Sequence, residues 1–312
     1  MTPAAFAVAT AAVAGGNCAP LAVAVSGGPD SFALLWLAHA AFPGRVHALT
    51  VDHGLRPGSD TEAETVARLC GSLGVPHATL AWRSDKPAAN LQAAARTARY
   101  ALMGNWCAAT GIAWLATAHH ADDQAETVLM RLARGSGSAG LSGIRRRRDL
   151  GQGVTLLRPL LDVRRAELAG IIAAAGWTAV DDPANRSPRF ERTRARALLA
   201  TTPWLPAGRL AASAMHLAAA EVALDWAAAL AWDSRVTVTS DSITLDAAGL
   251  PPEIARRLLV RIVAELAPGV SVSGPAVARW QMRLDTGAGA SLGGVAGQGG
   301  VIWRFRRAAP RR

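Results

Sequence analysis

Apolar and polar positions follow two patterns along the first two-thirds of the chain. Short apolar runs bounded by turn residues predict buried strands at residues 21–25, 46–51, 77–82 and 112–117. Segments with apolar side chains at helical spacing alternate with them and predict helices at residues 31–41, 61–73, 90–110 and 122–134. Asn90 is the expected N-cap of the third helix. Because strands joined by helices usually run parallel, we expect an α/β fold with a doubly wound parallel sheet covered on both faces.

The pattern changes after about residue 204, where Pro203 and Pro206 are typical of a linker. An alanine-rich helix, an alternating hairpin, two shorter helices and a glycine-rich tail are expected at residues 210–232, 235–245, 253–266, 275–284 and from Gly287. We therefore expect a main domain at residues 1–204 and a smaller α+β appendage at residues 205–312.

Composition adds charge to this picture. The chain has 312 residues, 51% of them hydrophobic, and a formal net charge of +10. Lys86 is the only lysine, so nearly all the positive charge is arginine. Arginine binds phosphate through two parallel hydrogen bonds, which favours an anionic partner such as nucleic acid. The alternative is a composition that simply uses arginine and alanine everywhere.

The cysteines and the N-terminal segment indicate in which cellular compartment the protein is expected. Cys18, Cys70 and Cys107 form no Cys-x-x-Cys pair, which argues against zinc, an iron–sulfur cluster or a disulfide framework and favours a reducing cytoplasm. The N-terminal Ala/Val run has no basic residue before Arg45, so we expect a helix there rather than a signal peptide. We expect no segment to span a membrane.

A candidate phosphate loop follows the first predicted strand. Its glycines allow the backbone to approach an anion, its serines add hydroxyl donors, and a helix start follows. Asp30 would repel phosphate unless a cation lay between them, so it predicts Mg²⁺. The lysine of the Gly-x-x-x-x-Gly-Lys motif is absent, which favours holding a pyrophosphate while the α-phosphorus is attacked. The alternative is an ordinary turn. The loop consists of Ser26, Gly27, Gly28, Pro29, Asp30 and Ser31.

Further candidates stand at the ends of the other strands. A cluster at the start of one predicted helix consists of His119, His120, Asp122 and Asp123. It is a metal site, a helix cap, or a second catalytic loop able to take a proton from an amine. Glu126 is expected on the helix surface.

Two pairs on the remaining elements have open interpretations. Asp52 and His53 end the second strand and would contact nucleotide or substrate, or cap a turn. Arg96 and Arg99 share a helix face and would meet phosphate or water. Residues 135–140 match Gly-x-Gly-x-x-Gly but follow a helix, so we expect a flexible loop and no dinucleotide fold.

These motifs carry a resemblance over roughly residues 20–200. SGGPDS resembles the loop signature of N-type ATP pyrophosphatases (PP-loop enzymes). With VDHGLR, QAAARTARY, TAHHADDQAETVLMRLARGSGSAGLSG and RPLL, in that order, the chain resembles tRNA(Ile)-lysidine synthetases. The resemblance implies an adenine nucleotide alpha hydrolase-like fold that uses ATP and Mg²⁺.

The resemblance also implies a reaction. The C2 oxygen of the wobble cytidine of tRNA(Ile) with a CAU anticodon would attack ATP, releasing pyrophosphate, and free L-lysine would then displace AMP to leave lysidine. Asp30, His119 and Asp123 match catalytic positions, Asp30 as the Mg²⁺ ligand, and Arg96 would meet phosphate. The appendage would bind tRNA or serve as scaffold, and the protein could form a homodimer.

A later segment resembles the family's D-x-x-N…R-N-x-x-R motif. Asp182, Asn185, Arg192 and Arg196 match it and are expected to contact tRNA or lysine, or to form a loop and helix cap. Thr193 stands where the family usually has Asn. The competing functions are a tRNA thiolase, which would need catalytic cysteines, an ATP sensor without turnover, and a plain RNA-binding protein.

Overall fold

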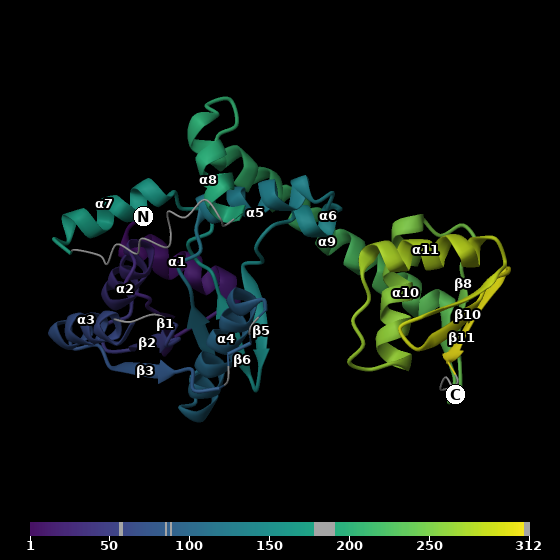
Figure 1. Ribbon diagram of the computed structural model, residues 1–312, viewed down its shortest axis with the longest axis horizontal. Coiled ribbons are helices and arrows are strands. Elements are labelled where there is room, and N and C mark those ends of the chain that lie inside the picture. Colours follow the sequence, from purple (N-terminus) through teal and green to yellow (C-terminus); the bar gives the residue numbers. More distant parts are fainter. Residues whose placement is uncertain (56–58, 85, 88, 178–190, 309–312) are drawn as a thin grey trace. The chain divides into compact units, whose positions relative to one another are not determined.

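The structure is a computed structural model that describes residues 1–55, 59–84, 86–87, 89–177 and 191–308 (Figure 1). The chain divides into two compact units, Met1–Ala218 and Ala219–Arg312. Asp182 and Asn185 lie outside the described residues.

The first unit is built on a six-stranded sheet with the order β3-β2-β1-β4-β6-β5. All neighbouring strands run parallel except β5, which pairs antiparallel with β6 at one edge. This confirms the expected doubly wound parallel sheet. The strands are β1 Leu21–Ala24, β2 Val46–Asp52, β3 His77–Ala81, β4 Trp114–Ala116, β5 Arg147–Gly151 and β6 Val154–Leu157.

Helices cover both faces of this sheet (Figure 1). Because successive side chains of a strand point to opposite faces, Val23 of β1 packs with α1, α2, α3 and α7, whereas Ala22 packs with α4. Tyr100, Met103 and Cys107 form the buried stripe of α4. The helices are α1 Pro3–Ala14, α2 Pro29–Ala41, α3 Ser59–Ser72, α4 Leu91–Ala109, α5 Ala121–Ala133, α6 Ser138–Leu141, α7 Arg165–Ala174 and α8 Glu191–Thr201.

The strand order reverses at β1. The chain passes from β1 to β2 and β3 on one side and then crosses through α4 to β4 on the other. In open sheets of this kind, ligands bind beyond the carboxyl ends of the strands at the reversal. The loops that follow β1, β2 and β4 are those that carry the candidate residues.

Three local expectations need correction. The antiparallel strand β5 was not predicted, because its residues are mostly exposed and polar and carry no apolar signal. Asn90 is at the N-cap position of α4 as expected, but it has a left-handed φ of 56° and its side chain forms no capping hydrogen bond. The segment expected as a flexible loop contains the short helix α6, held by Arg131, whose Nη1 donates to the carbonyls of Gly140 and Gly143 at 2.6 and 2.8 Å.

The second unit contains a five-stranded antiparallel sheet with the order β7-β8-β11-β10-β9. The expected hairpin is confirmed as β7 and β8, while the glycine-rich tail supplies the other three strands. Helices α10 and α11 share a core with this sheet that includes Trp280 and Phe305. The elements are β7 Val236–Val238, β8 Ile243–Asp246, α10 Pro252–Leu266, α11 Gly274–Asp285, β9 Gly289–Leu292, β10 Val295–Gln298 and β11 Ile302–Arg307.

Helix α9 spans Ala207–Arg235 and belongs to both units. The compact units divide inside this helix, later than residue 204, because buried Ala207 and Ala214 belong to the first unit. Contrary to expectation, α9 is long and apolar enough to cross a membrane by length and composition, with a mean hydropathy of 1.3. One such helix is weak evidence for a span, and its hydropathy comes mainly from alanine.

Candidate active site

A pocket of about 640 Å³ lies over the carboxyl ends of β1, β2 and β4. Its volume is in the range of sites that enclose a nucleotide-sized ligand. The structure brings together nearly all the described candidate residues there. Those that line it are Ser26, Gly28, Pro29, Asp30, Ser31, Asp52, His53, Arg96, Arg99, His119, Asp123, Arg192 and Arg196.

The loop between β1 and α2 has the geometry of an anion cradle. Gly27 does not line the pocket but makes the turn, with a φ of 84° that favours glycine. The Ser31 hydroxyl accepts from the Ser26 backbone N–H at 3.1 Å and donates to the Gly28 carbonyl at 2.8 Å, which fixes the loop. Helix α2 begins after Gly28 with no side-chain cap. Its first N–H groups are therefore available to a negatively charged ligand.

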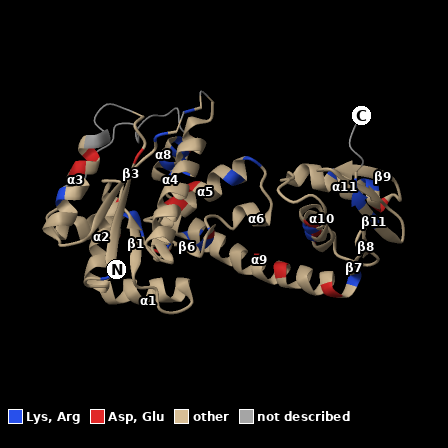
Figure 2. Cartoon of the chain, turned by 90° about the horizontal axis from the view of Figure 1, so that it is seen from below, with Lys and Arg blue, Asp and Glu red and all other residues tan. Residues whose placement is uncertain are grey.

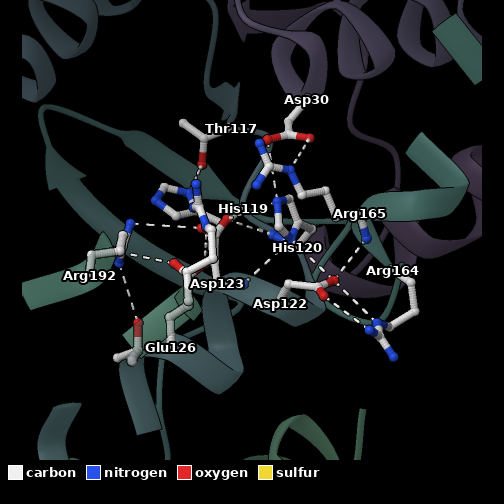
Figure 3. A network of polar contacts seen from close by, with 12 residues as sticks. Asp30, Thr117, His119, His120, Asp122, Asp123, Glu126, Arg164, Arg165 and Arg192 are labelled. Carbon is white, nitrogen blue, oxygen red and sulfur yellow. Dashed lines mark hydrogen bonds and ion pairs between the residues drawn. The ribbon is translucent and has the colours of Figure 1, made fainter. Parts of the chain in front are cut away.

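His120 is the centre of the polar network beside this loop (Figure 3). Its side chain is buried, with Nε2 lying 3.3 Å from Asp30 Oδ2 and 3.6 Å from Asp123 Oδ2. It also caps α5, since its Nδ1 accepts from the Asp123 backbone N–H while the Asp123 carboxylate accepts from the His120 N–H. Although burial lowers the pKa of His120, the hydrogen bond and charge of Asp30 and the charge of Asp123 outweigh burial and raise it. The residue thus links the phosphate loop to the second candidate loop.

Asp122 holds the start of α7 against α5. Its carboxylate accepts from the Arg164 side chain at 3.0 and 3.2 Å and from the Arg165 backbone N–H at 2.8 Å. These bonds lower the pKa of Asp122 against the effect of burial. Arg165 reaches the pocket, with Nε 4.0 Å from Asp30 Oδ1. Asp122 therefore places a cation beside the phosphate loop.

Glu126 is buried rather than on the helix surface. Its side chain is 2% exposed and accepts from Arg196 Nε at 2.7 Å, while Arg192 Nε lies 3.4 Å away. Arg192 also lies 3.7 Å from Asp123 Oδ1. The basic residues of α8 thus face the acidic start of α5 (Figure 2). The expectation failed because the partners of Glu126 come from a helix more than sixty residues later in the chain.

His119 faces the pocket in an electropositive setting. Its Nδ1 lies 2.9 Å from the Thr117 hydroxyl. Burial, followed by the positive charges of Arg158 and Arg99, lowers the pKa of His119 well below its usual value. The imidazole is therefore neutral at neutral pH and can accept or donate one hydrogen bond at each ring nitrogen.

Residues of β2, the loop after it and α4 line another side of the pocket. His53 packs edge-on against Trp82, and its buried Nδ1 has no hydrogen-bond partner among the described residues. Asp52 Oδ1 accepts from the Gly54 N–H at 2.8 Å, as the expected capped turn would. Arg96 and Arg99 both line the pocket, where Arg96 is exposed and Arg99 is half-buried.

The donor set fits a magnesium ion bound together with phosphate. Among the residues the structure describes, no three His, Cys, Asp or Glu side chains are grouped to hold a metal by themselves. Mg²⁺, however, is usually held by one or two carboxylates plus substrate phosphates and water. Asp30 and Asp123 place carboxylate oxygens within 3.6 Å of the same His120 nitrogen, beside the phosphate loop. This arrangement suits such a mixed site.

The three cysteines are remote from this chemistry. All are buried, and none lines the pocket. Burial raises the pKa of Cys70 to about 11 and that of Cys107 to about 12, so these thiols remain protonated.

The fold and site define a PP-loop protein, and comparison with known proteins agrees. Residues 9–202 match a family model described as a PP-loop domain. The fold is similar to that of the U34-tRNA thiolase NcsA from Methanococcus maripaludis, solved with its [4Fe-4S] cluster, with a TM-score of 0.57, 16% identity, and coverage of 68% of this chain and 78% of that one.

Curated relatives narrow the class. The chain is 44% identical to the tRNA(Ile)-lysidine synthase of Zymomonas mobilis over 94% of its own length and 89% of the relative. It is also 44% identical to the enzyme of the same name from Novosphingobium aromaticivorans, over 93% and 89%. The chain therefore belongs to the tRNA(Ile)-lysidine synthase family.

Proposed function

We propose that this protein ligates lysine to C2 of the wobble cytidine of tRNA(Ile) with a CAU anticodon, using ATP, and so forms lysidine. One observation carries the proposal. In a chain of this family, a phosphate loop with Asp30 leads into a helix without a side-chain cap, and His119 and Asp123 lie on the opposite loop of the same pocket. The reaction has two steps: the cytidine C2 oxygen attacks the α-phosphorus and pyrophosphate leaves, then the lysine ε-amine attacks C2 and AMP leaves.

ATP binds through its phosphates on the loop. The uncapped N–H groups after Gly28 and the hydroxyls of Ser26 and Ser31 hold the triphosphate at the N-terminus of α2. Asp30 would hold Mg²⁺, which would supply positive charge to neutralise the departing pyrophosphate. Arg165, positioned by Asp122, adds positive charge on the same side.

The second step needs a group that receives the lysine proton. The Asp123 carboxylate, fixed by its capping bond to His120, holds the ε-ammonium and takes its proton. Neutral His119 hydrogen-bonds the cytidine ring. Because its imidazole carries no charge, it does not repel the incoming ammonium group. Glu126 orients Arg192 and Arg196 of α8 toward the substrates.

The remaining assignments follow from the same function. Asp52 and His53 contact the nucleoside, and Asp182 and Asn185, outside the described residues, contact tRNA or lysine. We assign the protein to the cytoplasm, where its tRNA substrate resides. The second unit binds tRNA or acts as scaffold, and two copies of the chain could form a homodimer. Zinc and iron–sulfur clusters have no role in this proposal.

The related tRNA thiolase chemistry is disfavoured. Sulfur transfer through the protein requires reactive thiolates, whereas Cys18, Cys70 and Cys107 are buried with raised pKa values. The fold similarity to the thiolase stands at 16% identity and concerns the fold alone. A triple Cys→Ser variant should remain active.

The proposal is tested by transfer of labelled lysine to unmodified tRNA(Ile) in the presence of MgATP. Mild alkali cleaves aminoacyl esters and should spare a lysidine linkage. We expect alkali-stable label that depends on ATP and on the wobble cytidine, with a tRNA carrying wobble uridine as control. ATP-dependent pyrophosphate release without such label would contradict the lysine–tRNA identity.

A further inference from the structure

Several arginines gather around one tyrosine at the pocket wall. The guanidinium carbons of Arg96 and Arg99 lie 5.1 and 5.2 Å from the centre of the Tyr100 ring, and both residues line the pocket. Arg148 of β5 stacks on the same ring at 5.5 Å. Arg158, which follows β6, is 3% exposed, and its charge also acts on Tyr100. Four positive charges thus surround one buried phenol ring.

No carboxylate of the described residues is paired with this group. Within the part of the chain that the structure describes, Arg96, Arg99 and Arg158 form no ion pair with Asp or Glu. The Nε atoms of Arg99 and Arg158 are buried without a hydrogen-bond partner. Burial, joined by neighbouring positive charges, lowers the pKa values of Arg96 and Arg158. Arg158 is buried, Arg99 is half-buried and Arg96 is exposed in the pocket. Arg99 Nη2 donates to the Tyr100 hydroxyl at 3.4 Å and Arg158 Nη1 donates to the Arg145 carbonyl at 2.5 Å, and neither acceptor is a carboxylate. Because buried charge without a counter-charge is costly, an anion bound from outside the chain would stabilise this group.

We propose that Arg96 and Arg99, with the buried charge of Arg158 behind them, form a phosphate subsite distinct from the Ser26–Ser31 loop. The inference rests on the proposed function, whose substrates offer two sources of this group: the tRNA backbone next to the target cytidine, and the pyrophosphate end of ATP. Guanidinium forks match phosphate oxygens two by two. The three charges exceed what a single carboxylate would balance, which favours phosphate over the carboxylate of free lysine.

The position of the subsite suits either source. The charges of Arg158, Arg99 and Arg96 are those that act most on His119, so the subsite adjoins the reacting groups. A phosphate bound there would fix the substrate relative to His119 by contacts that do not take part in the chemistry.

The test uses Arg99→Gln with Arg148→Gln as its matched control. Both variants remove one charge and one stacking partner of Tyr100, but Arg148 is exposed and does not line the pocket. Dissociation constants for tRNA(Ile) are measured over a series of salt concentrations, and those for MgATP and inorganic pyrophosphate at fixed salt. Circular dichroism verifies folding, and Arg99→Lys tests rescue by charge alone.

A tRNA phosphate in the subsite predicts that Arg99→Gln weakens tRNA binding about tenfold, the scale of one charged hydrogen bond, and lowers the slope of log affinity against log salt by about 0.7–0.9. A phosphate of ATP predicts instead about tenfold weaker binding of MgATP and pyrophosphate with an unchanged salt slope. Either result supports the subsite. Arg148→Gln should change neither quantity.

The subsite would be overturned by unchanged affinities in Arg99→Gln, by equal losses in Arg148→Gln, or by a loss confined to the KM for lysine. The outcome is separable from failure of the proposed function. Wild-type protein that makes no alkali-stable lysyl-tRNA product would defeat the proposed function, whatever the binding results with Arg99→Gln show.

Discussion

The two units each contain a cluster built around arginine, and the clusters are balanced in opposite ways. In the second unit, Arg257 of α10 is 12% exposed and is paired with Glu221 at 2.6 Å, Glu253 at 2.9 Å and Asp225. In the first unit, Arg96, Arg99 and Arg158 have no carboxylate partner among the described residues.

This difference distinguishes arginines that stabilise the fold from arginines that are available to bind a ligand. Arg257 satisfies its charge within the chain and joins α9 to α10, so its role is folding. Arg96, Arg99 and Arg158 leave their charge for a ligand, whereas two carboxylates of the pocket, Asp30 and Asp123, lie close to His120. Substitutions in the pocket should therefore change turnover, and substitutions around Arg257 should change stability.

Asp30→Asn should have the largest effect. Losing the carboxylate removes several kcal/mol of cation-mediated charge stabilisation, so we expect pyrophosphate release to fall by about 10³-fold with the melting temperature unchanged. Asp162→Asn, at an exposed carboxylate paired with Arg146, serves as control. Near-normal turnover in Asp30→Asn would exclude the magnesium role.

Asp123→Asn and His119→Ala should come next. Removing a group that moves or directs a proton is expected to lower lysidine formation by about 10²-fold or more, while MgATP binding is kept. Turnover and the dissociation constant for MgATP are measured separately. If ATP binding disappears with activity, these residues belong to the nucleotide site and not to the second step.

Arg257→Met should show the reverse behaviour. It leaves three carboxylates facing each other, and we expect the second unit to lose about 3 kcal/mol of stability, with lysine transfer at low temperature retained. Denaturant unfolding followed by tryptophan fluorescence measures the loss, with exposed Arg279→Gln as control. A variant of wild-type stability would show that the carboxylates do not depend on Arg257.

The smallest effect concerns pH. The hydrogen bond from Arg256 lowers the pKa of Glu253, so its stabilising contribution is present above the unfolded value of about 4.3 and is lost as pH falls through the lower folded value. Glu253→Gln should therefore be less stable than wild type at pH 7 by roughly 0.5–1 kcal/mol. The difference should shrink in acid. A gap that widens below pH 4 would contradict the sign.

Local features were predictable from the sequence, whereas pairings between distant segments were not. The loop Ser26–Ser31 and the alternation of strands and helices each depend on neighbouring residues, so pattern alone revealed them. The strand β5 escaped because an edge strand needs no apolar alternation. The pairing of His120 with Asp30 was not predicted, because the two residues lie ninety positions apart in the sequence.

The two glycines of the phosphate loop are required for different reasons. Gly27 has a φ that only glycine adopts easily, whereas Gly28 has an ordinary φ of −74°, and an added Cβ would meet only the Ser26 hydroxyl, at 3.8 Å. The backbone thus requires the first glycine, whereas the second would be required only by the close approach of the phosphate in the proposed function. A diverged copy that no longer bound a nucleotide could replace Gly28 by another residue without straining the loop, but it would still need Gly27. The residues at these two positions would therefore distinguish loss of substrate binding from loss of the fold.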